Sequence, residues 1–179
     1  MIVVCGALES KSGHPGSSHA IAAAAASAGA VVQVIGIVPD GAEGDRLILE
    51  LAEAGIGHAA VLRTMERPME PADLSLALRY LPEVDVVIGV KLAADLLSSL
   101  AAGAAFAGAP LVVVAGTGGS ATDDPLMPVE ATVLVAPASD PDGTFAGFVA
   151  AFAVRLDRGE VPADAWTATL EALAVDPVR

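Results

Sequence analysis

The sequence is poor in cysteine, aromatic and basic residues. Cys5 is the only cysteine among 179 residues, which excludes a disulfide framework and a thiolate metal cluster and fits a reducing compartment such as the cytoplasm. Lys and Arg number 9 against 22 Asp and Glu, for a formal net charge of −13. Nucleic acid is therefore not expected as a partner, because phosphate contacts need clustered cations. The only lysines are Lys11 and Lys91, too few for a polybasic membrane patch.

The sequence also lacks a segment suited to secretion or to crossing a membrane. The first ten residues, MIVVCGALES, have no basic region, and their apolar run is too short for a secretory signal. The hydrophobic stretch 92–114 is interrupted by Asp95, Gly103 and Pro110, so it does not supply about 20 uninterrupted apolar residues. We expect a cytoplasmic protein that makes no membrane contact.

Apolar residues, in contrast, are abundant. They make up 54% of the chain, charged residues only 17%, and the mean hydropathy is +0.64, which predicts a folded chain and not a disordered one. The length fits one domain spanning residues 1–179. With so few aromatic residues, much small apolar surface has to be buried. We therefore expect a homo-oligomer, most simply a dimer.

Short β-branched runs alternate with longer segments rich in Ala and Leu along the whole chain. Several of the runs, such as VVQVIGIV and LVVVAG, are apolar at nearly every position, as strands covered on both faces are. The pattern predicts an α/β three-layer sandwich with a mostly parallel, doubly wound sheet. Strands are expected at 2–5, 31–38, 59–63, 84–90, 111–115 and 132–136, and helices at 17–28, 42–54, 72–81, 92–107, 144–157 and 163–174.

Two segments together resemble a known family. Residues 13–57 read GHPGSSHAIAAAAASAGAVVQVIGIVPDGAEGDRLILELAEAGIG, and residues 140–152 read DPDGTFAGFVAAF. The first is similar to the N-terminal core of the ribokinase-like (phosphofructokinase B type) carbohydrate kinases, and the second resembles the family's Asp-Thr-x-Gly-Ala-Gly-Asp-x-Phe signature. The resemblance implies a ribokinase-like core and ATP-dependent phosphoryl transfer to a sugar or similar alcohol, with ATP and Mg²⁺ as cofactors.

The second segment departs from the family's signature where the chemistry resides. In the family, the last Asp of the signature is the general base, and the preceding glycines expose N–H groups to the transferred phosphoryl group. Ala146 falls on the base and Phe145 on the second glycine. No catalytic residue is therefore expected, and Asp140 and Asp142 are only weak substitutes for the base.

The remaining site residues follow from the same alignment. Gly143 and Thr144 are candidates for binding an anion or nucleotide, with Asp142 expected to cap the helix at 144–157. Phe145 is expected to face solvent or line a cleft. Gly116 and Gly119, in VVVAGTGGS, fall on the family's nucleotide-proximal glycines; this segment lacks the lysine of a P-loop, so a surface loop is the alternative.

The residues aligned with those that bind the acceptor sugar also depart from the family's pattern. Gly16, Ser18 and Asp40 lie at the substrate positions, but the family's Asn falls on Ser18 when counted from Gly16 and on Ala20 when counted back from Gly29, so neither register has it. Asp40 is also expected to cap the helix at 42–54. The gaps before residue 17 and after residue 63 are short for the family's β-hairpin lid, which is expected to be missing. No metal site is expected, because His14 and His19 have no third ligand in place.

Three functions remain open on this reading. The favoured one is a degenerate kinase-family protein, a pseudokinase, that binds a small-molecule ligand or a partner without transferring phosphate. The second is an active kinase for a sugar or small alcohol that uses Asp140 or Asp142 as base. The third is a non-catalytic structural or regulatory subunit.

Overall fold

The computed structural model describes residues 1–8, 17–64, 67–116 and 131–174. In this part of the chain, six parallel strands form one sheet in the order β3-β2-β1-β4-β5-β6. The chain starts in the middle of the sheet, builds outward to β3, returns to β4 beside β1, and builds outward again, so the sheet is doubly wound. The strands are β1 (Ile2–Gly6), β2 (Val32–Val38), β3 (Gly57–Arg63), β4 (Val86–Val90), β5 (Leu111–Ala115) and β6 (Thr132–Val135).

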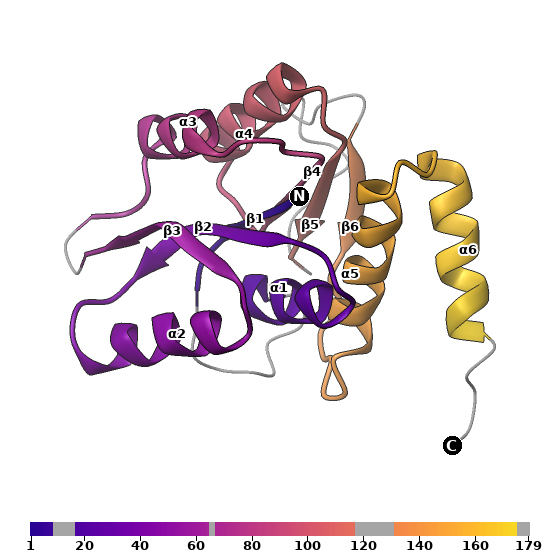
Figure 1. The fold of residues 1–179 in the computed structure, drawn as a ribbon, viewed down its shortest axis with the longest axis horizontal. Helices are drawn as coiled ribbons and strands as arrows, with labels where there is room; N and C mark the ends of the chain where they lie inside the picture. Colours follow the sequence, from indigo (N-terminus) through magenta and orange to yellow (C-terminus); the bar gives the residue numbers. More distant parts are fainter. Residues whose placement is uncertain (9–16, 65–66, 117–130, 175–179) are drawn as a thin grey trace.

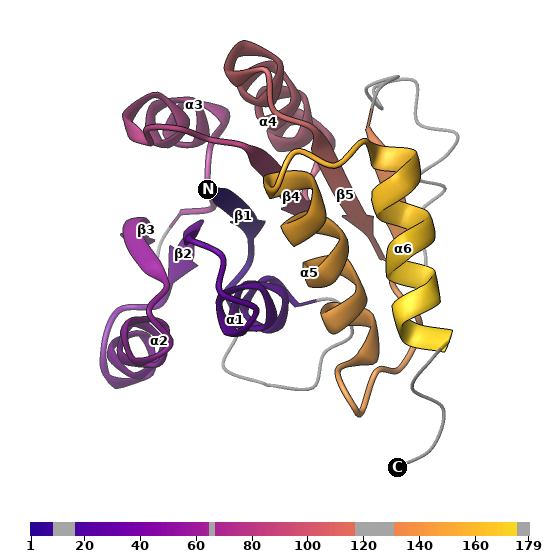
Figure 2. The same ribbon diagram turned by 45° about the vertical axis from the view of Figure 1, so that its right-hand side comes forward.

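Helices cover both faces of the sheet. One face carries α1, α2 and α5, and the opposite face carries α3 and α4 (Figure 1). Helix α6 packs on the outer side of α5 (Figure 2). No helix in the described ranges is long and apolar enough to cross a membrane. The helices are α1 (Ser18–Ser27), α2 (Ala42–Glu53), α3 (Pro71–Tyr80), α4 (Ala94–Ala107), α5 (Thr144–Asp157) and α6 (Pro162–Ala174).

The apolar strands form a core on each side of the sheet. In β1, Ile2 and Val4 join the cluster under α1 and α5, whereas Val3 and Cys5 join the cluster under α3 and α4. Side chains of a strand point alternately to its two faces, so a strand buried on both sides has to be apolar throughout. All five residues of β1 are accordingly buried.

Aromatic packing holds α6 in place. Trp166 contacts Phe148 and Phe152 of α5 with ring centroids 5.1 and 5.8 Å apart, both edge-to-face, the arrangement that aromatic quadrupoles favour. Three of the six aromatic residues thus lie where the outermost helix joins the sandwich.

Glycines follow the first two helices directly after the ends that the sequence predicts, residues 28 and 54. Gly29 and Gly55 have φ of 87° and 70°, and the residue after each donates its N–H to a carbonyl in the last turn of the helix. At α4, Gly103 serves close packing instead. A Cβ there would collide with the Leu78 side chain of α3.

The α/β three-layer prediction is confirmed, and the sheet is parallel throughout. Strand β4 is shorter than expected and begins at Val86. The reason lies just before it: Glu83 has a φ of 51°, which an extended strand does not allow. In addition, the Asp85 N–H and side chain bond to Met1.

Candidate functional site

The carboxyl edge of the sheet is the expected place for a ligand in a fold of this kind. The winding direction reverses between β1 and β4, so the helices after these strands go to opposite faces. In doubly wound sheets, ligands bind beyond the carboxyl ends of the strands at this reversal point. Strand β1 ends at Gly6 and β4 at Val90. Lys91 follows directly with a φ of 50°, a conformation that is uncommon outside glycine. Its exposed side chain lies at the reversal point.

The N-termini of α1 and α5 lie at this same edge, because each helix follows the carboxyl end of a parallel strand. Helix α1 is capped by Ser17, whose Oγ accepts a hydrogen bond from the N–H of Ala20 at 3.1 Å. The neighbouring Ser18 is 1% exposed. A Cβ on Gly6 would collide with the Ser18 Oγ and would lie 2.8 Å from the carbonyl oxygen of Val90. Ser18 is thus packed against the ends of β1 and β4. This packing leaves no space for a side chain at position 6, which is why a glycine is required there.

The N-terminus of α5 is occupied by a carboxylate of the chain itself. Oδ1 of Asp140 accepts a hydrogen bond from the N–H of Phe145 at 3.1 Å, and Oδ2 accepts one from the N–H of Ala146 at 3.3 Å. Asp140 is 8% exposed. Gly143, the N-cap residue, has a φ of 68° and turns the chain between Asp140 and the helix. The N–H groups at this helix end are the ones that would otherwise bind an anion.

This geometry corrects two expectations about helix caps. Asp142 does not cap α5: no N-cap side chain bonds there, Asp142 is exposed, and Asp140 supplies the carboxylate. Asp40 does not cap α2 either. That helix begins after Gly41, which has a φ of 96°, and it has no side-chain cap. Asp40 itself is exposed after the end of β2.

The residues aligned with the family's signature have different surroundings. Thr144 and Gly143 are exposed at the start of α5. Phe145 is half-buried and packs against the cluster under α1 and α5, so it is not fully solvent-facing. Ala146 is 3% exposed and belongs to that cluster. The position aligned with the general base therefore faces the core.

The other predicted residues are only partly accounted for. Gly116 follows β5 at the same carboxyl edge and is half-buried. Gly16, His14 and Gly119 lie outside the described residues. His19, in the first turn of α1, has its Nδ1 3.9 Å from a Glu50 carboxylate oxygen. Within the described ranges no three His, Cys, Asp or Glu side chains are grouped so that they could hold a metal ion.

Sequence reasoning missed two features of this edge. One is the left-handed conformation of Lys91, for which the sequence offers no signal. The other is the cap from Asp140, which lies four residues before α5 and reaches the helix across the turn at Gly143. The cap rule favours an acidic residue close to the helix in sequence, and so it pointed to Asp142, the nearer of the two.

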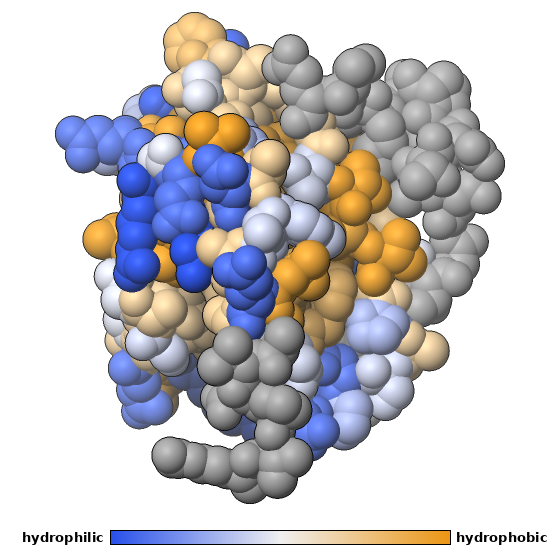
Figure 3. All heavy atoms as spheres, turned by 90° about the vertical axis from the view of Figure 1, so that its right-hand side faces the viewer, coloured by the Kyte–Doolittle hydropathy of each residue, from blue (hydrophilic) through white to orange (hydrophobic). Residues whose placement is uncertain are grey.

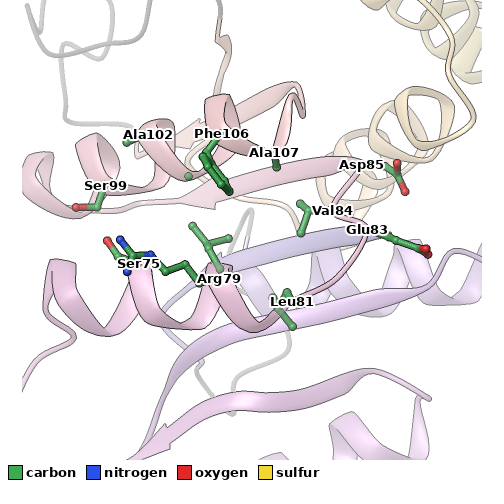
Figure 4. Close-up of a pocket in the computed structure, with 12 residues that line it drawn as sticks. Ser75, Arg79, Leu81, Glu83, Val84, Asp85, Ser99, Ala102, Phe106 and Ala107 are labelled. Atoms are coloured by element: carbon green, nitrogen blue, oxygen red, sulfur yellow. The ribbon is translucent and has the colours of Figure 1, made fainter.

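A separate groove of about 1010 Å³ lies away from this edge, between α3 and α4 (Figure 4). Val84 and Asp85, which precede β4, line one end of it. It therefore reaches the amino end of the sheet and is separate from the carboxyl edge.

No protein-family model matches the sequence, and no curated protein matches it. Solved structures do match. The crystal structure of Sa239 is 15% identical with a TM-score of 0.67, and the alignment covers 99% of this chain and 94% of that one. Arabidopsis thaliana ribokinase complexed with ribose and ATP is 15% identical with a TM-score of 0.61, covering 94% and 89%. An E. coli protein described as a ribokinase II, in complex with ATP and Mg²⁺, is 11% identical with a TM-score of 0.65, covering 94% and 89%. The chain thus has the fold of the ribokinase-like carbohydrate kinases.

Proposed function

We propose that this protein is a degenerate member of the carbohydrate kinase family, a pseudokinase that binds a small-molecule ligand or a partner without transferring phosphate. The observation that carries the proposal is the pair of hydrogen bonds from the N–H groups of Phe145 and Ala146 to the Asp140 carboxylate. In an active kinase of this fold, such N–H groups are needed for the transferred phosphoryl group.

A comparison of two electrostatic energies favours the exclusion of phosphate from the N-terminus of α5. A helix N-terminus attracts a negative charge by about 1 kcal/mol. Two like unit charges 4 Å apart repel each other by about 4 kcal/mol at an effective dielectric constant near 20. With Asp140 already in place, the repulsion outweighs the attraction.

The position of the base supports the same proposal. Ala146 carries no proton acceptor and is buried in the core cluster. Loss of a general base reduces a reaction rate by about 10²–10⁴. Asp140 is a poor replacement because both its oxygens are engaged, which leaves Asp142 as the exposed carboxylate nearby.

The lengths of two connections further support a missing lid. Only residues 7–17 separate β1 from α1, and only residues 64–70 separate β3 from α3. A β-hairpin of two four-residue strands and a two-residue turn needs about ten residues, which the second connection does not have and the first has with almost none to spare. Without such a cover, water competes with the acceptor hydroxyl for the phosphoryl group.

The test is a coupled ADP-release assay over a panel of sugars and nucleosides, with and without Mg²⁺. We expect no acceptor-dependent turnover above background. Turnover of about one per second, within the usual range for enzymes, would overturn the proposal. Its loss in Asp142→Asn would then identify Asp142 as the base of an active kinase.

A titration with ATP separates the pseudokinase from a purely structural subunit. ATP binding without turnover supports a retained ligand site. If neither ATP nor any sugar of the panel changes the melting temperature or gives heat in a calorimeter, the ligand-binding form of the proposal fails and only the partner-binding form remains.

A further inference from the structure

The groove between α3 and α4 combines an exposed aromatic ring with a lining of small and aliphatic residues. Phe106, on α4, is 91% exposed, and its ring stands beside the groove in Figure 4. The lining contains four small residues, Ser75, Ser99, Ala102 and Gly103, together with the aliphatic Leu78, Leu81 and Val84. The close approach of Gly103 to Leu78 keeps the two helices together beneath it. One surface therefore carries both a projection and a hollow that such a projection could fill.

Charges are placed at opposite ends of this groove. Figure 4 shows the Arg79 side chain at the end marked by Ser75 and Ser99, and Glu83 with Asp85 at the other end. Arg79 and Glu83 are exposed. Among the described residues neither has an ion-pair partner, since the ion pairs of this part of the chain involve other side chains.

A surface that is positive at one end, negative at the other and apolar between them is complementary to itself after a twofold rotation. In a twofold dimer the same patch faces its own copy, so each patch has to supply both partners of every contact. The rotation brings Arg79 of each copy opposite Glu83 of the other. It also brings each Phe106 ring toward the small residues of the facing groove.

We infer that the α3–α4 face is the interface of a symmetric homodimer, in which Phe106 of each copy fills the groove of the other and Arg79 pairs with Glu83 across the interface. This interface is independent of the proposed function, because the groove is separate from the carboxyl edge of the sheet. An exposed aromatic seated among small residues is the kind of anchor that dominates interface energies. The charge pairs fix the antiparallel orientation.

The face formed by α6 is less suited to the same role. It exposes Val161, Leu170 and Leu173 at 60%, 47% and 43%, and hydrophobic patches lie beside hydrophilic ones there (Figure 3). However, the ionisable residues of α6 are Asp164 and Glu171, both acidic. Two copies of this helix would bring like charges together, which opposes self-association.

The first experiment measures the mass of the whole chain by light scattering after size exclusion, at about 50 μM chain. The buffer should contain about 0.15 M salt, which screens the repulsion between two chains of charge −13. We expect twice the mass of one chain. A strictly monomeric protein under these conditions overturns the inference.

Variants then locate the interface. Phe106→Ser should raise the dimer dissociation constant by about 30-fold or more, as loss of an aromatic anchor does. Leu49→Ser is the matched control, because Leu49 is 57% exposed on α2, on the opposite face of the sheet. It should leave the dissociation constant unchanged. A dimer equally sensitive to both changes, or insensitive to Phe106→Ser, places the interface elsewhere and overturns the assignment.

A charge exchange tests the orientation. Arg79→Glu and Glu83→Arg, each alone, put like charges across both halves of the interface and should weaken the dimer. An equimolar mixture of the two variants restores both opposite-charge pairs in the mixed dimer, so association should recover. Thermal unfolding of each variant at the wild-type temperature shows that folding is unaffected. Failure of the mixture to associate, with both variants folded, overturns the pairing.

Discussion

Asp140 and Phe145 are joined by a hydrogen bond of 3.1 Å from the N–H of Phe145 to the Asp140 Oδ1 atom, across the turn that Gly143 makes. The second oxygen of the same carboxylate bonds to the next N–H along the helix. One side chain thus satisfies two of the N–H groups that a helix start leaves without a partner.

Replacing Asp140 should therefore destabilise the fold. We expect Asp140→Ala to lower the free energy of unfolding by about 1–2 kcal/mol, the upper part of the range for helix caps, because the Ala146 N–H is then left buried without a partner. Urea unfolding followed by circular dichroism measures the change. Asp142→Ala is the matched control; Asp142 is exposed and should change the value by less than about 0.5 kcal/mol. Equal losses for the two variants would contradict the assignment of the cap.

The sequence anticipates the fold far better than the details of this cap. The apolar runs identify all six strands, most clearly β1 and β4, where every residue is buried and no position is left for a polar side chain. Gly29 and Gly55 mark the ends of two helices for an equally local reason, since their φ values of 87° and 70° suit glycine above other residues.

Which side chains reach the candidate site depends on the path of the chain between helices and strands. Local sequence patterns do not contain that path. Whether Asp140 or Asp142 reaches α5 is decided by the turn at Gly143. The register of the helix decides whether the residue aligned with the base faces the carboxyl edge of the sheet or the core, and Ala146 faces the core. The alignment with the family's signature gives the position of a residue along the helix but not which way its side chain points.

Removing the Asp140 carboxylate should open the start of α5 to inorganic phosphate. The melting temperature of Asp140→Ala should rise when phosphate replaces chloride at equal ionic strength. Phosphate at tenfold its dissociation constant stabilises the folded state by about 1.4 kcal/mol. The wild-type protein should not respond, because its N–H groups are bonded to Asp140.

The Phe145→Gly variant provides the control for this experiment. The family resemblance alone would assign the blocked site to the Phe145 side chain, and a glycine there would then restore anion binding. In the structure the N–H of Phe145 is held by Asp140, so Phe145→Gly should not respond to phosphate. A response in Phe145→Gly as large as that in Asp140→Ala would show that the side chain, and not the carboxylate, closes the site.

Cys5 should report global unfolding and the alkaline limit of stability. It is fully buried in the middle of the sheet, and burial raises the pKa of its thiol from 9.0 to about 12. Because the thiolate is the reactive form, labelling by a disulfide reagent at pH 8 should be slow in the native state and should follow unfolding in urea.

The sign of the pH effect follows from the direction of the shift. The pKa of Cys5 is raised on folding, so the stabilising contribution of the neutral thiol is fully present below pH 9. It is lost as the pH rises toward 12. Unfolding midpoints measured from pH 8 upward should fall more steeply for the wild type than for Cys5→Ala, and equal slopes would contradict the expectation.

Ala146→Asp tests whether a carboxylate at the position aligned with the family's base can act as a base in this protein. Ala146 is 3% exposed within an apolar cluster, so an aspartate there would be a buried charge without a partner, at a cost of about 3–5 kcal/mol. The matched control is Gly147→Asp, one residue along, where an added Cβ meets no atom within 4 Å. Asp140 already satisfies this helix end, so the added charge gains little from the helix dipole, and Gly147→Asp should stay within about 1 kcal/mol of the wild type. Urea unfolding separates the two variants, and the ADP-release assay should detect turnover in neither. The contrary result is wild-type stability of Ala146→Asp together with acceptor-dependent turnover. The new carboxylate would then have to lie at the carboxyl edge of the sheet and not in the core, which would require α5 to be rotated about its axis.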